Sequence, residues 1–169
     1  MKTYKITSQK DLEKFKDDYG YKIDGNAEFS YTAIFDGRLD VEGYLVTEAG
    51  SYIKAGSWIE AGYSIEAGDF IKAGSWIKAG DSYGIQAGLN ITCKGTLSFG
   101  LKAFAGISTW REISEEEKTI TCSKMIGGGV VEYGTLVETG EEIEKMIELS
   151  NGKKVSESTI IEALRALTE

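Results

Sequence analysis

Residues 51–80 decide the fold of this chain, because they read SYIKAG SWIEAG YSIEAG DFIKAG SWIKAG, five hexads without an insertion. Every hexad has Ile at its third place and ends in Ala-Gly. Six steps of about 100° do not return to the same side of a helix, whereas alternate residues of a strand share one face. Ile and Ala would then point inward, and Gly would lie at a corner, where unusual backbone angles cost least. The hexads therefore predict a short parallel β-helix in which three hexads form a triangular coil of about 18 residues.

This period places chemically related side chains above one another on neighbouring coils. The superposed pairs are Tyr52 and Phe70, Trp58 and Trp76, Lys54 and Lys72, and Glu60 and Lys78. The last pair has opposite charges, which predicts an ion pair between two coils.

The inward column continues on both sides of the hexads in a weaker form. Phe35 and Val41 lie one period before Ile53 and Ile59. The unit after Gly80, DSYGIQAG, is two residues longer than a hexad, so we expect a small loop at 81–84. Beyond the loop, Ile91 and Leu97 continue the column, which fades near 103–106. The pattern predicts about four to five coils across residues 21–108.

The N-terminal segment provides a candidate cap for the open end of the solenoid. Ser8 followed by Asp11 is typical of a helix start. Leu12, Phe15 and Tyr19 then fall on one helical face, and Gly20 would end the helix. We therefore expect a capping helix within residues 1–20.

The C-terminal segment, residues 109–169, has a different composition, with 13 acidic and 7 basic residues. Residues 118–125 and 130–137 have strand composition and are joined by Gly127–Gly129, which predicts a flexible hairpin turn. Asn151-Gly152 is a second hairpin signal. A last helix is expected to begin at Ser156 or Ser158, and its apolar stripe comprises Ile160, Ile161, Leu164 and Leu167. The segment is predicted to be a small α+β region.

The I-x-A-G hexads resemble the hexapeptide repeats of left-handed parallel β-helices. This resemblance covers about half of the chain and implies the handedness of the coil. The best-known proteins of this kind are acyltransferases that use a histidine between subunits. This chain has no histidine, so the resemblance does not extend to that activity.

A short solenoid of Ile-Lys/Glu-Ala-Gly hexads with a compact tail also looks like small proteins of phages and mobile elements. Some of these proteins inhibit host defence, including anti-CRISPR proteins. The resemblance implies that the chain binds a protein target of the host, inside the host cytoplasm.

Composition excludes several classes of function. The formal net charge of −8 argues against a general binder of nucleic acids or anionic membranes. The absence of histidine removes imidazole catalysis and His-ligated metal sites. Two cysteines, Cys93 and Cys122, are too few for a disulfide framework, and no segment has the length of a signal peptide or membrane span. We expect a cytoplasmic protein without a cofactor and without a catalytic centre.

The first candidate site is the aromatic ladder of Tyr52, Phe70, Trp58 and Trp76. Rows of large exposed aromatics often mark an interface, and sugars or bases can stack on them. The alternative is that another segment of the chain or a second subunit covers the rings.

The second candidate is acidic. Its residues are Glu112, Glu115, Glu116 and Glu117 in one cluster, and Glu138, Glu141, Glu142 and Glu144 in another. Such clusters can mimic nucleic-acid phosphates in a basic groove of a partner. The alternative is an ordinary acidic surface.

Three functions follow from these features. The first is a non-enzymatic inhibitor of a host defence complex that acts by protein–protein contact. The second is a self-assembling scaffold, since we expect a homo-oligomer, with a dimer favoured. The third is a carbohydrate- or small-ligand-binding module that uses the aromatic ladder.

Overall fold

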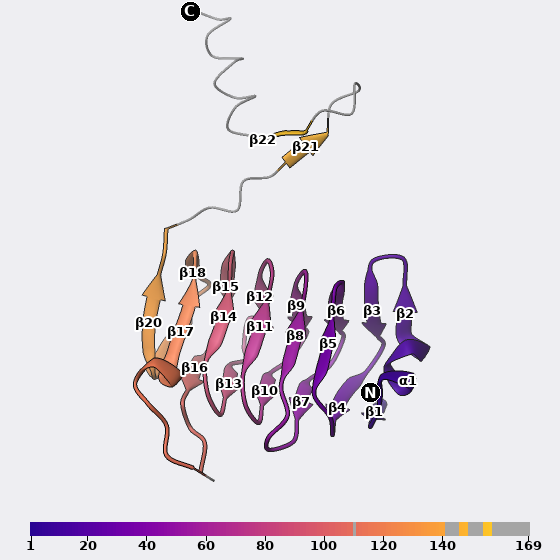
Figure 1. The fold of residues 1–169 in the computed structure, drawn as a ribbon, viewed down its shortest axis with the longest axis horizontal. Helices are drawn as coiled ribbons and strands as arrows, with labels where there is room; N and C mark the ends of the chain where they lie inside the picture. Colours follow the sequence, from indigo (N-terminus) through magenta and orange to yellow (C-terminus); the bar gives the residue numbers. More distant parts are fainter. Residues whose placement is uncertain (110, 141–145, 149–153, 157–169) are drawn as a thin grey trace, which may run out of the picture.

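The computed structural model describes residues 1–109, 111–140, 146–148 and 154–156. Residues 1–109 and 111–140 form a parallel β-solenoid of about seven coils, whose strands build three long sheets (Figure 1). The fold is mainly β, as the hexads predict.

A complete coil contributes one strand to each sheet, in the order sheet A, sheet C, sheet B, and the first coil has no strand in sheet C. Sheet A contains β1 (Thr3–Ile6), β4 (Asn26–Phe29), β7 (Leu45–Thr47), β10 (Ile65–Ala67), β13 (Ile85–Ala87), β16 (Lys102–Ala105) and β19 (Val130–Tyr133). Sheet C contains β5 (Ala33–Phe35), β8 (Ile53–Ala55), β11 (Ile71–Ala73), β14 (Ile91–Cys93), β17 (Thr119–Cys122) and β20 (Thr135–Glu138). Sheet B contains β2 (Lys16–Asp17), β3 (Gly20–Ile23), β6 (Arg38–Val41), β9 (Ile59–Ala61), β12 (Ile77–Lys78), β15 (Thr96–Ser98) and β18 (Lys124–Ile126).

The register between strands confirms the inward column. Ile71 lies between Ile53 and Ile91, and all three side chains are buried. Burial of an Ile side chain contributes roughly 1.5–3 kcal/mol, so a stack of such residues is the main stabilising feature of the solenoid. The corners of neighbouring coils also lie too close together for a side chain, because a Cβ on Gly74 would lie 1.9 Å from the carbonyl oxygen of Gly56. Glycine at the sixth place is therefore required by close packing between coils.

The coil has about 20 residues and not the predicted 18. The 18-residue spacing holds only where units of six residues follow one another without interruption, as between Ile53 and Ile71. Two-residue insertions at corners account for the difference. One is the expected loop at 81–84, which begins with a turn in which Tyr83 N–H donates to the Gly80 carbonyl. The other is a turn at 48–51, in which Ser51 N–H donates to the Glu48 carbonyl.

The second turn changes the predicted pairing of the earlier coils. Leu39, not Val41, lies beneath Ile59, and Val41 lies beneath Ala61. Phe35 is displaced by two residues in the same way. The prediction was wrong here because it assumed a constant period.

The N-terminal cap is present but is shorter than predicted. It comprises α1 (Gln9–Leu12) and the 3-10 helix η1 (Glu13–Phe15), and Leu12 is fully buried. The capping role predicted for Ser8 is confirmed, since its Oγ accepts from Asp11 N–H at 3.3 Å. The helix does not reach Gly20, because the chain turns back into the antiparallel pair β2–β3. The parallel strands also begin earlier than residue 21, since β1 pairs with β4.

The solenoid extends past the predicted boundary at residue 108. Strands β17 to β20 continue the three sheets to Glu138, so this part is not a separate α+β unit. Gly127–Gly129 is a corner between β18 and β19, which lie in different sheets, and is therefore not a hairpin turn. A long loop between β16 and β17 contains the 3-10 helix η2 (Glu116–Lys118) and interrupts the period. A search of the sequence at a fixed period therefore does not find this last coil.

Two short strands follow the solenoid. They are β21 (Met146–Glu148) and β22 (Lys154–Ser156), and they pair antiparallel, as expected around Asn151-Gly152. The turn itself and the expected last helix with its stripe of Ile160, Ile161, Leu164 and Leu167 lie outside the described residues.

Candidate interaction surface

The predicted aromatic ladder is present as two stacked pairs at two corners of the solenoid. The ring centroids of Tyr52 and Phe70 are 4.0 Å apart at an interplanar angle of 21°. Those of Trp58 and Trp76 are 5.1 Å apart at 13°. The first pair lies at the corner that leads into sheet C and the second at the corner that leads out of it.

Sequence reasoning missed a third pair at the remaining corner. The rings of Tyr63 and Tyr83 are 4.9 Å apart and tilted by 30°. The two-residue insertion after Gly80 moves Tyr83 out of the hexad register, so a search at a fixed period does not find it. Allowing a period of 20 residues across the insertion would have revealed it.

The stacked rings are half-buried, and much of their faces is occupied by one another. Trp58 also has the Arg38 guanidinium 5.8 Å from its ring centroid. Stacking of this kind stabilises adjacent coils, since aromatic pairs contribute about 0.5–1.5 kcal/mol beyond their buried area. The rings therefore offer a partner mainly their edges, which suits van der Waals contact with a protein better than face-on stacking of a sugar or a base.

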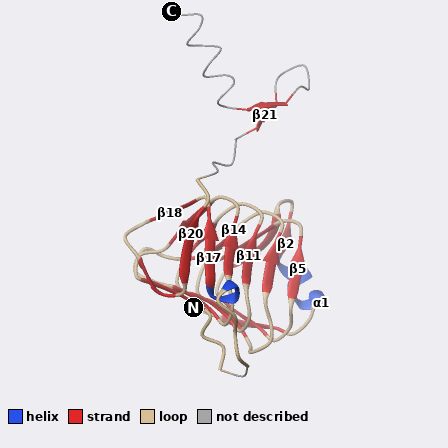
Figure 2. Cartoon of the chain, turned by 60° about the vertical axis from the view of Figure 1, so that its left-hand side comes forward, coloured by secondary structure: helices blue, strands red, loops and turns tan. Residues whose placement is uncertain are grey.

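Between these two stacks lies the outer face of sheet C, whose central strands stand side by side in Figure 2. The outward residues of β8, β11 and β14 are Lys54, Lys72 and Thr92, which lie in register, and Lys94 follows at the next corner. We call this surface, formed by Lys54, Lys72, Thr92 and Lys94, the lysine face. Its three lysines are exposed, and none forms an ion pair within the described part of the chain.

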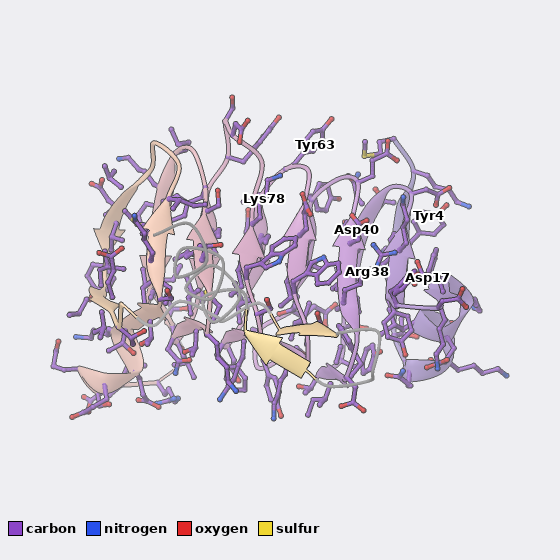
Figure 3. All side chains as sticks on the ribbon, turned by 90° about the horizontal axis from the view of Figure 1, so that it is seen from above. Tyr4, Asp17, Arg38, Asp40, Tyr63 and Lys78 are labelled. Carbon is purple, nitrogen blue, oxygen red and sulfur yellow. The ribbon has the colours of Figure 1, made fainter. Side chains whose placement is uncertain are left out.

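The outer face of sheet B is different, because it presents carboxylates beside its cations and several of these charges are paired. Lys78 Nζ lies 3.0 Å from Glu60 Oε1, which confirms the predicted ion pair, and this contact raises the pKa of Lys78. Arg38 contacts both Asp17 and Asp40 (Figure 3). Lys78 and Arg38 are therefore balanced by carboxylates of the same sheet, although Asp40 and Glu60 are like-charged neighbours.

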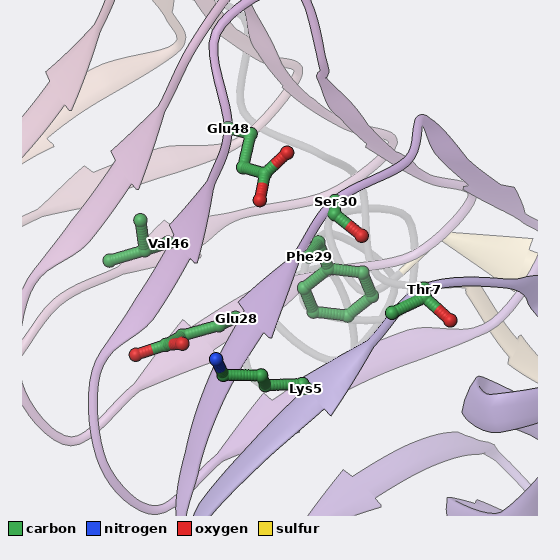
Figure 4. A pocket seen from close by; sticks show the side chains of 7 residues that line it. All are labelled: Lys5, Thr7, Glu28, Phe29, Ser30, Val46 and Glu48. Carbon is green, nitrogen blue, oxygen red and sulfur yellow. The ribbon is translucent and has the colours of Figure 1, made fainter.

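Sheet A has a mixed outer face with one open hollow near its N-terminal end (Figure 4). Its lining residues are Lys5, Thr7, Glu28, Phe29, Ser30, Val46 and Glu48. Hydroxyls, carboxylates and one amine surround it, and Thr7 Oγ1 donates to Asp11 Oδ2 at 2.9 Å. Asp11 also accepts from Lys14 and Ser8, and these contacts hold the pKa of Asp11 well below its usual range. A carboxylate with so low a pKa is a weak base, so the Thr7–Asp11 contact belongs to the turn that begins α1 and does not activate the Thr7 hydroxyl.

The first acidic cluster lies on the loop between β16 and β17, and two of its four carboxylates are ion-paired. Glu117 forms a two-pronged pair with Arg111, with Nη2 to Oε1 at 2.6 Å, which lowers the pKa of Glu117 to about 2. Glu115 pairs with Lys118 at 2.7 Å. Hydrogen bonds from its own backbone N–H and from Ser114 lower the pKa of Glu116, and Glu112 is exposed. Half of this cluster is thus already neutralised, which weakens its likeness to a row of phosphates.

The second acidic cluster is described only at Glu138. This residue is at the end of β20, where its Oε1 accepts the backbone N–H of Met125 in β18 at 2.6 Å. Glu138 therefore satisfies a donor on the last strand of sheet B. Glu141, Glu142 and Glu144 lie outside the described residues.

The two cysteines are buried in the interior of the solenoid. Burial raises the pKa of the Cys93 thiol to about 12 and that of Cys122 above its ordinary value. Because the thiolate is the reactive form, these positions are core residues and not nucleophiles.

Among the described residues, no group of three or more Cys, Asp or Glu side chains is placed to hold a metal ion. No helix there is long and apolar enough to cross a membrane.

No protein-family model matches the chain, and neither a curated protein nor a solved structure matches it. Assignment of the chain to the parallel β-solenoids therefore rests on its own repeat and its own strand pairing.

Proposed function

We propose that this chain is a non-enzymatic protein-binding solenoid whose contact surface is the lysine face together with the two aromatic stacks that border it. The observation that carries the proposal is the placement of half-exposed Tyr, Phe and Trp rings at both edges of one regular sheet. Tyr, Trp and Phe are enriched at protein interfaces, and Tyr and Trp are frequent among the residues that dominate binding energy.

Protein binding suits this surface better than carbohydrate binding does. A sugar ring packs against the open face of an aromatic ring, and here the rings stack on one another. The exposed ring edges and the intervening lysine stems offer a broad, shallow surface, which is how most protein partners are bound.

The resemblance to small phage and mobile-element proteins supports a finer form of this proposal. A phage inhibitor of a host defence complex, such as an anti-CRISPR protein with a left-handed hexapeptide coil, would act through a contact of this kind. The carboxylates of Glu112 and Glu116, which form no ion pair with the described residues, would then supplement the contact.

The experiment uses three outward residues of one coil, Gln86 in sheet A, Thr92 in sheet C and Ser98 in sheet B. A photoreactive amino acid is placed at each position in turn, and the full-length chain is irradiated in cell extract. We expect discrete adducts of defined mass from position 92 and none from positions 86 and 98. Equal labelling from all three positions, or no adduct at position 92, would contradict the proposal.

A second function, the self-assembling scaffold, is favoured by the contrast between the two ends of the solenoid. At the N-terminal end, α1 buries Leu12 completely. At the other end, Met125, Val131 and Leu136 are only partly buried, and β18, β19 and β20 are the last strands of their sheets among the described residues. Open edges and apolar ends promote association.

Light scattering coupled to size-exclusion chromatography tests this second function on the full-length chain. We expect a defined oligomer whose mass is independent of the dilution. A monomer at every concentration would contradict it, and would leave the protein-binding proposal unaffected.

A further inference from the structure

We propose that the partner bound by the lysine face is a protein surface that presents a row of carboxylates. This inference rests on the proposed function and adds the chemistry of the partner, which the acidic composition of the chain does not suggest.

The first observation is the charge of this face compared with the rest of the molecule. The chain carries a net charge of −8, yet β8, β11 and β14 contain no acidic residue. Two of these strands present an outward lysine, and Lys94 follows the third. A concentrated positive region on an acidic protein provides orientation and selectivity toward a complementary negative surface.

The second observation is that Lys54 and Lys72 lie directly beside each other on neighbouring strands. Like charges in this arrangement destabilise a sheet, and opposite charges stabilise it. One corner away, the same two coils have the opposite pair Glu60 and Lys78. The like-charged pair is thus unfavourable for the isolated chain and becomes favourable when external carboxylates lie between the two ammonium groups.

The third observation concerns the surroundings of these lysines. The Tyr52–Phe70 stack lies on one side of them and the Trp58–Trp76 stack on the other, and all four rings are half-exposed. Apolar contacts that surround charged contacts exclude water from them, and charge–charge attraction is stronger where water is excluded.

The same geometry separates a protein from a nucleic acid as the partner. Single-stranded nucleic acids stack their bases on open aromatic faces, and here the rings stack on one another. Three lysines also neutralise few phosphates, whereas nucleic-acid binding of useful strength requires many such contacts. A protein surface with carboxylates needs neither open aromatic faces nor many cations, so it fits this face better than a nucleic acid does.

The experiment measures binding of poly-L-glutamate, as a carboxylate probe, to the full-length chain at low ionic strength by the change in tryptophan fluorescence. The test variant is K54Q/K72Q/K94Q. The matched control is K5Q/K10Q/K22Q, which removes the same charge from exposed lysines outside the lysine face. We expect the test variant to bind about tenfold more weakly than the wild type, with a shallower salt dependence, and the control to bind about as the wild type does.

A separate variant distinguishes a binding role from a structural one. Lys72→Glu places an acid beside Lys54, so we expect it to raise the stability of the fold while it weakens poly-L-glutamate binding. A purely structural role for Lys72 would not produce these two opposite changes.

Equal weakening in the test variant and the control, or no binding of poly-L-glutamate by the wild type, would overturn the inference. Tighter binding of an oligothymidylate than of poly-L-glutamate would overturn it in favour of a nucleic acid. The photoreactive residue at position 92 can also be placed in the K54Q/K72Q/K94Q variant. If this variant gives the same adduct as the wild type, the proposed function stands and only the carboxylate inference fails. If position 92 yields no adduct, the proposed function itself fails.

Discussion

The outer faces of sheets B and C differ although the same hexads build both. Ile71 in sheet C and Ile77 in sheet B occupy the same inward place, and each lies in a column of buried apolar residues. Among the outward side chains of these coils, Glu60 and Lys78 form an ion pair on sheet B, whereas Lys54 and Lys72 are like-charged neighbours on sheet C. The inward side chains thus determine the fold, and the charges of the outward side chains can differ between the two sheets.

Magnitudes explain this division. An inward Ile contributes roughly 1.5–3 kcal/mol by burial, whereas a pair of outward side chains contributes about 0.2–1 kcal/mol. An unfavourable outward pair is therefore tolerated by the fold, so outward charges can be set by binding at little loss of stability.

The largest expected effect tests whether the two sheets share one interior. Ile71→Ala under sheet C and Ile77→Ala under sheet B should each destabilise the fold by about 2–5 kcal/mol, because both leave a cavity in a packed column. Urea unfolding followed by circular dichroism measures the loss, with the outward variant Thr92→Ala as control. A small effect at one of the two positions would mean that the sheets do not share an equivalent core.

A smaller effect is expected at the corner between the two faces. Trp76→Ala removes one ring of the Trp58–Trp76 stack, so we expect a loss of about 1–3 kcal/mol and a red-shifted emission from Trp58. Urea unfolding and fluorescence measure both quantities. An unchanged stability would indicate that the stack serves a partner alone and does not support the coils.

The next effect is smaller and should have opposite signs on the two faces. Lys78→Glu creates a like-charged pair with Glu60 and should destabilise the fold by about 0.2–1 kcal/mol. Lys72→Glu replaces a like-charged pair by an opposite one and should stabilise the fold by a similar amount. The two differences should diminish in about 1 M salt, where exposed charges are screened. Changes of the same sign in the stability of the two variants would contradict the difference in charge pairing between sheets B and C.

The smallest effect concerns pH. Because the pKa of Lys78 is raised in the folded state, its pair with Glu60 stabilises the fold fully below the ordinary lysine pKa of 10.5. This contribution is lost as the pH rises through the raised value. The stability of the wild type relative to Glu60→Gln should therefore be constant at neutral pH and decline in alkaline solution. A difference that grows with pH would contradict the assignment of the pair.

Part of the candidate surface could be predicted from the sequence. The pairs Tyr52–Phe70 and Trp58–Trp76 lie within uninterrupted hexads, where a fixed period determines which side chains meet. The Tyr63–Tyr83 pair spans an insertion, so a fixed period does not bring its members together. The acidic residues were identified by composition, which cannot show that Arg111 and Lys118 neutralise Glu117 and Glu115.

The sequence by itself determined that this chain forms a parallel coil and which residues of the hexads point inward, because a strict repeat of six residues with Ile and Ala on alternate places is compatible only with strands and corners. The tertiary structure alone decided where the coil ends and which residues lie above one another outside the hexads. Strand β17, which begins after the long loop, still pairs with β14, since Ile120 is seated on Ile91. Register between coils is set by hydrogen bonds and by packing in the interior, and a corner of different length alters it without altering the pattern within a strand. The charged neighbours Lys54–Lys72 and Glu60–Lys78 lie within the hexads and followed from the sequence, whereas the place of Thr92 beside Lys72 depends on the register across the insertion.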